Sequence, residues 1–126
     1  MELQSKVIAG LERIGDVFKT LLWQKAKVYG ISPIQIQILL FAASHDTNLC
    51  NVSYLAKEFN ITKPTISDAV RVLLKKGFLK KDDSPVDSRR YNLVLLPTGK
   101  QLVQELLDYT LPVAAALEHI NKKELK

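Results

Sequence analysis

Apolar residues recur at helical spacing between Ser53 and Gly77 and predict two helices joined by a short turn. Ser53 and Thr62 are placed to cap the amino termini of these helices, because their hydroxyl oxygens can accept hydrogen bonds from free backbone N–H groups. Asn60 falls where the first helix must end, and asparagine tolerates the left-handed conformation of such a position. Gly77 is predicted to end the second helix. The rest of the chain is arranged around this helix–turn–helix.

The second of these helices, residues 63–76, has two different faces when its residues are placed at intervals of about 100°. One stripe is apolar and is predicted to face the core: Ile66, Ala69, Val70, Leu73 and Leu74. The opposite stripe comprises Pro64, Asp68, Arg71 and Lys75, flanked by Thr65, Ser67 and Val72. Short side chains near the amino terminus, followed by an arginine, are typical of a helix that lies in the major groove of DNA. An ordinary amphipathic surface helix is the alternative.

Residues 3–29 are predicted to form one long helix that ends at Gly30. Its apolar positions lie three or four residues apart, close to the spacing of a helix–helix seam: Leu3, Val7, Leu11, Ile14, Phe18 and Leu21. This stripe either forms the seam of an oligomer or packs against the chain's own domain.

The segment Ser32-Pro33-Ile34-Gln35 has the signature of a capping box with proline in the first helical turn, and it predicts the start of another helix. That helix is apolar on nearly every side through Ala43, so we expect it to be the buried central helix. Residues 45–48 are a loop by composition, and residues 49–52 are predicted to form a short strand.

The segment that follows Gly77 predicts a two-stranded ribbon. Residues 78–81 form the first strand, residues 82–88 a turn-rich tip, and residues 89–95 the returning strand. Arg89 and Arg90 lie just past that tip, where an exposed ribbon can bring arginine to a neighbouring minor groove.

A last helix begins at Pro97 or Thr98, is kinked or broken at Pro112, and resumes over residues 114–120. The order of elements therefore predicts a mainly α protein with a small β wing, that is, an α+β winged helix–turn–helix with long amino- and carboxy-terminal helices.

The 126 residues are expected to form a single winged-helix domain. Within it, the helices of residues 1–30 and 98–120 would form a dimer lobe. Residues 32–96 would form the DNA-binding core, with the wing at residues 78–96.

The formal net charge of +5 is concentrated in one part of the chain. Between residues 57 and 81, seven basic side chains outweigh two acidic ones: Lys57, Lys63, Arg71, Lys75, Lys76, Lys80 and Lys81 against Glu58 and Asp68. Such a patch attracts the phosphate backbone of a nucleic acid and binds it with release of counterions. A solvated lysine-rich surface is the alternative.

Few residues are available for other chemistry. His45, Asp46 and Cys50 are close in sequence but have no recognised metal-ligand spacing, so we predict no metal and no cofactor. The chain has no nucleophile elbow and no phosphate-binding glycine loop, so an enzyme is not expected. Cys50 is expected to be a buried, unreactive thiol rather than a sensor of oxidants.

Trp23, Tyr29 and Phe41 are expected to pack in the core, with a ligand cavity between the dimer lobe and the winged domain as the alternative. No ligand-binding residue is identified from the sequence. No apolar run approaches the roughly 18 residues of a membrane span, and no signal peptide opens the chain, so no membrane partner is predicted. The single cysteine fits a reducing, cytoplasmic location.

Residues 63–79 read K-P-T-I-S-D-A-V-R-V-L-L-K-K-G-F-L, and residues 87–99 read D-S-R-R-Y-N-L-V-L-L-P-T-G. The first segment resembles the recognition helix and the start of the wing in the MarR family (multiple antibiotic resistance regulators). The second resembles that family's wing signature, in which Asp87 and Arg89 match an Asp-x-Arg pair. The likeness spans roughly residues 5–120. It implies a homodimeric transcription regulator that binds double-stranded DNA at a pseudopalindromic operator and is often released by a small-molecule effector or an oxidant.

Three features depart from the family's pattern. Leu96 stands where the family usually has the threonine that caps the last long helix. Asp68 stands where a polar or basic DNA-contacting residue is common. The family usually adds a further helix, without which the dimer would rest on the first helix and the helix of residues 98–120.

The predicted function is sequence-specific DNA binding by a transcription regulator, a dimeric repressor that responds to a small ligand. A winged-helix module for protein–protein interaction in a larger assembly is the alternative. The predicted DNA-binding residues are Lys63, Thr65, Ser67, Asp68, Arg71, Val72, Lys75, Arg89 and Arg90. The resemblance implies that Asp87 orients Arg89 and fixes the wing, which leaves Arg90 to contact the groove or a phosphate.

Overall fold

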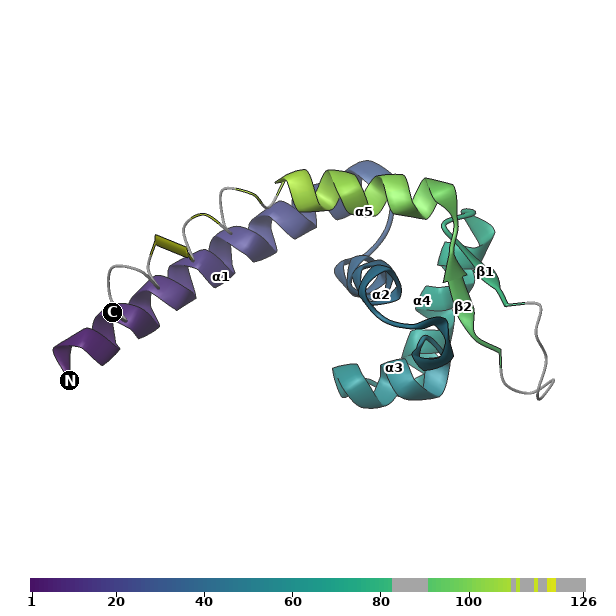
Figure 1. Ribbon diagram of the computed structural model, residues 1–126, viewed down its shortest axis with the longest axis horizontal. Helices are drawn as coiled ribbons and strands as arrows, with labels where there is room; N and C mark the ends of the chain where they lie inside the picture. Colours follow the sequence, from purple (N-terminus) through teal and green to yellow (C-terminus); the bar gives the residue numbers. More distant parts are fainter. Residues whose placement is uncertain (83–90, 110, 112–114, 116–117, 120–126) are drawn as a thin grey trace.

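The computed structural model describes residues 1–82, 91–109, 111, 115, 118 and 119. The elements follow in this order: α1 (Glu2–Tyr29), α2 (Pro33–Ser44), the 3₁₀ turn η1 (Thr47–Leu49), α3 (Val52–Phe59), α4 (Lys63–Lys75), β1 (Leu79–Lys81), β2 (Leu93–Leu95) and α5 (Pro97–Tyr109). This mainly helical architecture with a two-stranded antiparallel ribbon confirms the predicted winged helix–turn–helix (Figure 1).

Helices α3 and α4 form the predicted helix–turn–helix, with one difference at its start. Asn60 ends α3 in the left-handed conformation, with φ 55°, as expected. The amino-terminal cap of α3 is Asn51, whose side-chain oxygen accepts a 2.9 Å hydrogen bond from the Tyr54 N–H, so the assignment of Ser53 as the cap was wrong. Ser53 lies inside the first turn, because Asn51 takes the extended conformation that a capping residue needs.

The boundaries of α4 follow the sequence closely. Thr62 occupies the capping position, but its side chain bonds Thr65 (Oγ1···Oγ1 2.9 Å) and makes no capping hydrogen bond to the backbone. At the other end, Gly77 has φ 79° and Phe78 N–H donates to the Leu73 carbonyl at 3.1 Å, which closes the helix with a left-handed turn. Glycine fits this position because it has no Cβ to clash.

Helices α1 and α2 meet as the sequence predicts. Gly30 ends α1 in the left-handed conformation. The capping box of α2 is present, with Gln35 N–H donating to Ser32 Oγ at 3.3 Å and Ser32 N–H donating to Gln35 Oε1 at 2.7 Å. Helix α2 then crosses the centre of the core and packs against α1, α4, α5 and β2, which confirms its role as the central buried helix.

The predicted short strand at residues 49–52 was wrong. Residues 47–49 form η1, and α3 already begins at Val52. Cys50 nevertheless joins the ribbon through one backbone hydrogen bond, since Leu93 N–H donates to its carbonyl at 2.8 Å. A single hydrogen bond of this kind holds the segment beside β2 without making it a strand of its own.

The strands of the wing are shorter than expected. Strand β1 pairs with β2 in antiparallel register, Leu79 opposite Leu95 and Lys81 opposite Leu93. The returning strand was predicted from residue 89, but Tyr91 and Asn92 are not in the strand, and residues 83–90 lie outside the described residues. The predicted kink at Pro112 also lies outside them, as does most of the segment 114–120.

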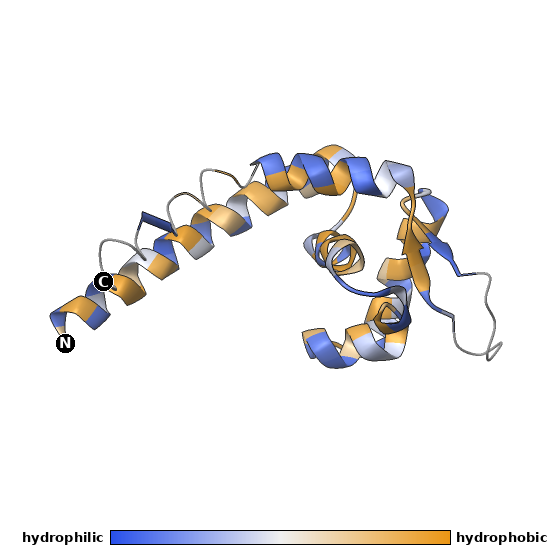
Figure 2. Cartoon of the chain, viewed as in Figure 1, coloured by the Kyte–Doolittle hydropathy of each residue, from blue (hydrophilic) through white to orange (hydrophobic). Residues whose placement is uncertain are grey.

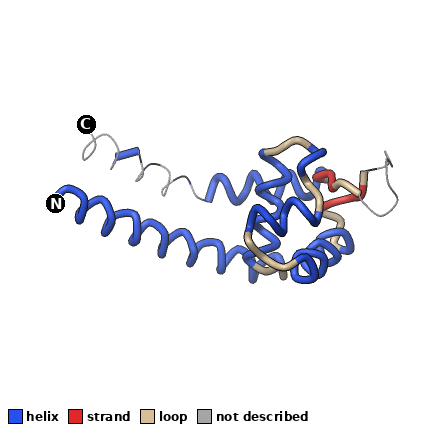
Figure 3. The backbone as a smooth tube through the Cα atoms, turned by 90° about the horizontal axis from the view of Figure 1, so that it is seen from below, coloured by secondary structure: helices blue, strands red, loops and turns tan. Residues whose placement is uncertain are grey.

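The hydrophobic core lies under the helix–turn–helix and gathers side chains from every helix and both strands. Its largest fully buried members are Ile36, Ile38, Leu39, Leu55, Ile66, Leu73, Leu79, Leu93 and Leu102. Helix α1 meets this core through its carboxyl-terminal part, with Leu22 and Ala26 buried and Phe18 and Tyr29 partly buried against it. Its amino-terminal part extends away from the helix–turn–helix and the wing (Figures 1 and 3).

The extended part of α1 keeps many apolar side chains in solvent. Figure 2 shows hydrophobic residues along the whole length of this helix. The exposed large apolar residues of the described chain concentrate on α1 and at and just beyond the end of α5: Met1, Leu3, Ile8, Leu11, Val17, Trp23, Val28, Leu107 and Leu111, with Tyr54 on α3 as the exception. Among the described residues, no single helix is long and apolar enough to cross a membrane, and α1 with α2 meets that test only as a pair bent by 95°.

Gly99 provides a test of the packing between α5 and the wing. A Cβ at this position would lie 2.4 Å from the Phe78 carbonyl oxygen and 2.6 Å from Leu95 Cδ1. We expect Gly99→Ala to reduce the free energy of unfolding by about 1–3 kcal/mol, because the Phe78 backbone cannot move aside freely. Chemical denaturation followed by circular dichroism measures the effect.

Gly15→Ala is the matched control, since Gly15 is also helical but has no heavy atom within 4 Å of its added Cβ. That substitution should stabilise the helix by roughly 0.5–1 kcal/mol. Equal effects of the two substitutions would show that the contact between Gly99 and the wing is not tight.

Candidate nucleic-acid interface

The polar stripe of α4 is open to solvent. Ile66, Ala69, Val70 and Leu73 are buried against α2 and α3, which turns the opposite side of the helix outward. Of the seven α4 residues predicted to bind DNA, Lys63, Thr65, Asp68, Arg71 and Lys75 are exposed, whereas Ser67 and Val72 are half-buried. The structure therefore leaves all seven of these residues at least partly accessible to a partner.

Helix α4 is held in place by polar contacts as well as by its apolar stripe. The buried Gln35 of α2 donates from Nε2 to the Ala69 carbonyl at 3.4 Å. At the carboxyl end, Thr98 Oγ1 donates to the Gly77 carbonyl at 2.5 Å, and Leu96 N–H donates to the Phe78 carbonyl at 3.0 Å. The end of α4 is thus fastened to the beginning of α5. This role of Thr98 was not predictable from the sequence, because its partner Gly77 is distant in the chain.

Asp68 and Arg71 form an ion pair in the middle of the exposed stripe. Arg71 Nη2 lies 2.5 Å from Asp68 Oδ1, and the two side chains remain 74% and 69% exposed. A surface pair of this kind stabilises a protein by about 0–1 kcal/mol. Its main consequence is local: Arg71 is held in a defined direction, and the centre of the stripe carries no net charge.

Positive charge surrounds this neutral centre. Lys63 begins α4, Lys75 and Lys76 end it, and all three are exposed. In the wing, Lys80 and Lys81 are exposed, and the Lys81 ammonium lies 4.3 Å from the centre of the Tyr91 ring. A cation over an aromatic face is attracted by the ring quadrupole, which restrains Lys81 at the end of β1. Asp87, Arg89 and Arg90 lie outside the described residues.

The three aromatic residues considered for a ligand cavity lie in different places. Phe41 is buried, stacks on the His45 ring at 3.8 Å and meets Tyr54 and Phe59, so its predicted core role is confirmed. Tyr29 is partly buried against the core. Trp23 is exposed beside Lys27, so its predicted core role was wrong. Its side chain is turned to solvent, whereas Leu22 and Ala26 in the same part of α1 face the core.

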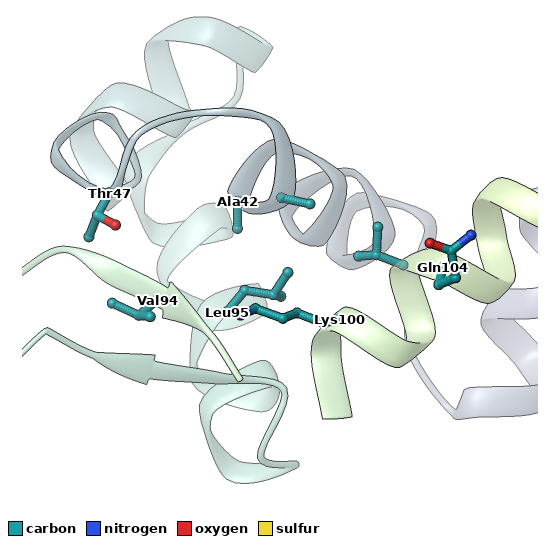
Figure 4. Close-up of a pocket in the computed structure, with 8 residues that line it drawn as sticks. Ala42, Thr47, Val94, Leu95, Lys100 and Gln104 are labelled. Carbon is teal, nitrogen blue, oxygen red and sulfur yellow. The ribbon is translucent and has the colours of Figure 1, made fainter. Parts of the chain in front are cut away.

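A cavity of about 380 Å³ lies instead between α2, β2 and α5. Figure 4 shows Ala42 and Thr47 on one side of it, Val94 and Leu95 of β2 on the other, and Lys100 and Gln104 coming from α5. Its lining is mixed, with an apolar floor and an ammonium, an amide and a hydroxyl group. Within the described part of the chain, no three His, Cys, Asp or Glu side chains gather to hold a metal ion.

A sequence model described as MarR family matches residues 29–90 of this chain. Among curated proteins, no sequence matches it. Among solved structures, a MarR transcriptional regulator from Methanosarcina mazei is similar with a TM-score of 0.67 and 24% identity, over 94% of this chain and 82% of that one.

Two further structures show the same fold. The transcriptional regulator Tm0710 from Thermotoga maritima is similar with a TM-score of 0.72 and 21% identity, over 94% of this chain and 80% of its own. The MepR–DNA complex from S. aureus is similar with a TM-score of 0.69 and 24% identity, over 84% of this chain and 78% of the MepR chain.

Cys50 is 1% exposed, and burial raises the pKa of its thiol from 9.0 to about 11. Burial of this thiol was therefore predicted correctly, and a native thiolate is disfavoured at neutral pH.

The raised pKa of Cys50 predicts a pH-dependent stability. From about pH 9 to 11 the unfolded chain releases the thiol proton while the folded chain keeps it, so the free energy of unfolding falls as pH rises. The contribution is complete below pH 9 and is lost as pH passes 11. Cys50→Ala lacks this contribution, so the stability difference between wild type and variant should change by up to about 1.4 kcal/mol per pH unit in that window. Urea titrations of both proteins across this range measure it, and a constant difference would contradict the raised pKa.

Proposed function

Because this chain belongs to the MarR family through residues 29–90, we propose that it is a transcription regulator that binds double-stranded DNA in a sequence-specific manner. The observation that carries the proposal is the side of α4 turned away from the core, which is exposed, polar and flanked by lysines. A helix with these properties matches the groove-reading helix of a helix–turn–helix. One of the similar structures, that of MepR, is a complex with DNA.

The residues of α4 divide into two roles in this proposal. Thr65, Ser67 and Arg71 face the major groove, where Arg71 can donate two hydrogen bonds to guanine. Lys63 and Lys75, at opposite ends of the helix, contact phosphates on the two sides of the groove and set the register without reading sequence.

Val72, Arg89 and Arg90 are proposed as further DNA contacts. Val72 is half-buried at the flank of the stripe, where an apolar side chain can meet a thymine methyl group. Arg89 and Arg90 are proposed to reach the neighbouring groove or a phosphate from the wing. A cytoplasmic location is likewise proposed from the single cysteine.

Two substitutions separate the two roles on α4. Arg71→Ala should reduce operator affinity by about 1–3 kcal/mol and relax the sequence preference at one position of each half-site. Lys75→Ala should weaken binding to all duplexes alike and lower the slope of log affinity against log salt by about one. Fluorescence anisotropy with duplexes enriched by in vitro selection, at two salt concentrations, measures both effects.

Lys19→Ala is the control, because it removes the same charge from the exposed surface of α1, away from α4. It should change neither the affinity nor the salt slope. If the wild-type chain shows no salt-dependent binding to duplex DNA, the alternative of a winged-helix module for protein–protein contact takes the place of this proposal.

We also propose that the regulator is a homodimer that binds a pseudopalindromic operator. The support is the set of exposed apolar side chains on α1, near the end of α5 and just beyond it. In a lone protomer these side chains would be in contact with water. Two copies of such a surface can bury each other around a two-fold axis. The two α4 helices would then enter successive major grooves on one side of the duplex.

The response to a small ligand is proposed at the cavity between α2, β2 and α5. Its volume of about 380 Å³ suits a small organic molecule. Because the cavity is lined by both β2 and α5, a bound molecule would contact the wing and the helix proposed for the dimer lobe at the same time.

Leu11→Glu tests the dimer. Leu11 lies within the α1 stripe and is 49% exposed in the protomer, so a charge there should be tolerated by the fold but should disrupt a helix–helix seam. We expect light scattering to report a dimer for the wild type and a monomer for the variant, with unchanged circular dichroism. Thr20→Glu, on the opposite side of α1, should remain dimeric. A wild type that is monomeric at high micromolar concentration would refute the dimer.

A further inference from the structure

The Asp68–Arg71 pair is unusual for the centre of a surface that meets DNA. A carboxylate there repels the phosphate backbone, and it lowers the net charge of the patch. Yet Asp68 lies on the same stripe as Arg71 and Lys75, remains 69% exposed, and holds the arginine through one hydrogen bond. Its position is therefore that of a side chain which faces the DNA together with Arg71.

The bond between the two side chains leaves most of their hydrogen-bonding capacity free. A guanidinium has five N–H donors and a carboxylate has about four lone-pair sites, and the pair joins only Nη2 to Oδ1. In the described structure, the pair thus presents guanidinium donors beside a carboxylate acceptor, at a fixed spacing and on one side of α4.

A guanine–cytosine pair presents the complementary pattern in the major groove. Guanine offers two acceptors, N7 and O6, and cytosine offers the N4 amino donor next to them. An adenine–thymine pair instead presents the thymine O4 acceptor and a methyl group on the pyrimidine side, and a carboxylate would be left without a donor there. The order of donors and acceptor on α4 therefore matches guanine–cytosine and opposes adenine–thymine.

We propose that Asp68 and Arg71 read one guanine–cytosine pair of each operator half-site as a unit, with Arg71 donating to guanine and Asp68 accepting from the cytosine N4 amino group. This inference rests on the proposed function, since it presupposes that α4 enters the major groove. Asp68 is then a specificity-determining residue: it costs affinity for DNA in general and gives selectivity for cytosine at one position.

Different residues of this surface are then responsible for selecting a base pair and for the overall affinity for DNA. The pair at the centre is neutral and selects the base pair, whereas Lys63, Lys75 and Lys76 at the two ends of α4 supply the attraction to phosphate. Removal of the carboxylate should therefore have opposite effects on the two quantities. Asp68→Ala should bind unrelated duplexes more tightly than wild type and should discriminate less between duplexes.

A modified base tests the cytosine contact directly. The full chain is first used to select a preferred duplex from a random pool, and each cytosine of the half-site is then replaced in turn by N4-methylcytosine. This base still pairs with guanine, but its methyl group replaces the amino hydrogen that faces the major groove. Wild type should lose about 5- to 100-fold in affinity at one cytosine of each half-site, the range expected for one base-specific contact.

The Asp68→Ala substitution in the protein should abolish the loss of affinity that N4-methylation causes. Asp68→Ala should bind the methylated and unmodified duplexes equally at this position, and it should also accept an adenine–thymine pair there with a smaller penalty than wild type. Glu12→Ala, which removes an exposed carboxylate from α1, is the control for net charge and should retain the full loss on methylation. Replacing the paired guanine by 7-deazaguanine should weaken wild type but not Arg71→Ala.

The outcomes distinguish this proposal from the one on which it rests. If the selected duplex binds with salt dependence but N4-methylation affects wild type and Asp68→Ala equally at every cytosine, the reading of cytosine by Asp68 is overturned while DNA binding stands. If the wild-type chain selects no duplex, both proposals fall together. If Asp68→Ala merely binds more weakly to all sequences, Asp68 only positions Arg71.

Discussion

The fold depends on the burial of one apolar stripe of α4. Ile66, Val70 and Leu73 are fully covered, and they belong to the same core as the residues of α2 and α3 on which α4 packs. Once that stripe is buried, the rotation of the helix about its own axis is fixed, since turning it would expose these side chains at a cost of roughly 1.5–3 kcal/mol each. The polar stripe then has only solvent, or a partner, to face.

The position of α4 along its axis depends on a second set of contacts at its carboxyl end. The Gly77 turn, the Thr98 hydroxyl and the close packing of Gly99 under the Phe78 carbonyl join α4, the wing and α5 at one point. Each contact involves backbone, which is stiffer than side chains. A movement of α5 is therefore expected to be transmitted to α4 and to the wing rather than absorbed between them. The cavity lined by β2 and α5 adjoins this junction.

Electrostatics on the exposed side of α4 follow a simple arrangement. The ion pair between Asp68 and Arg71 neutralises the middle of the surface. The lysines at both ends and in β1 keep the positive charge that long-range attraction to a polyanion requires. The hydrogen-bonding groups that could read a base pair and the charges that attract a polyanion therefore belong to different side chains of one small surface.

Elements whose signals are local could be predicted from the sequence. The capping box of Ser32 and Gln35, the left-handed Asn60 and the terminal Gly77 were all predictable, because each depends on residues within about four positions along the chain. The two faces of α4 were predictable for the same reason. From these came the winged helix–turn–helix and the residues of its exposed stripe.

Features that depend on distant partners could be seen only in the folded chain. Asn51 rather than Ser53 caps α3, and its side-chain amide also donates to Asn92 Oδ1, a distant residue beside β2, at 3.4 Å. The segment around Cys50 meets β2 through one hydrogen bond instead of forming a strand. Trp23 is exposed while Phe41 is buried, although both are aromatic residues in helices, because only one side of α1 meets the core whereas α2 crosses it. Asp68, which departs from the family's pattern in the sequence, accepts a hydrogen bond from Arg71 in the structure. The spacing of apolar residues predicts a helix and its apolar side, but which residues bury that side depends on the packing of the whole chain.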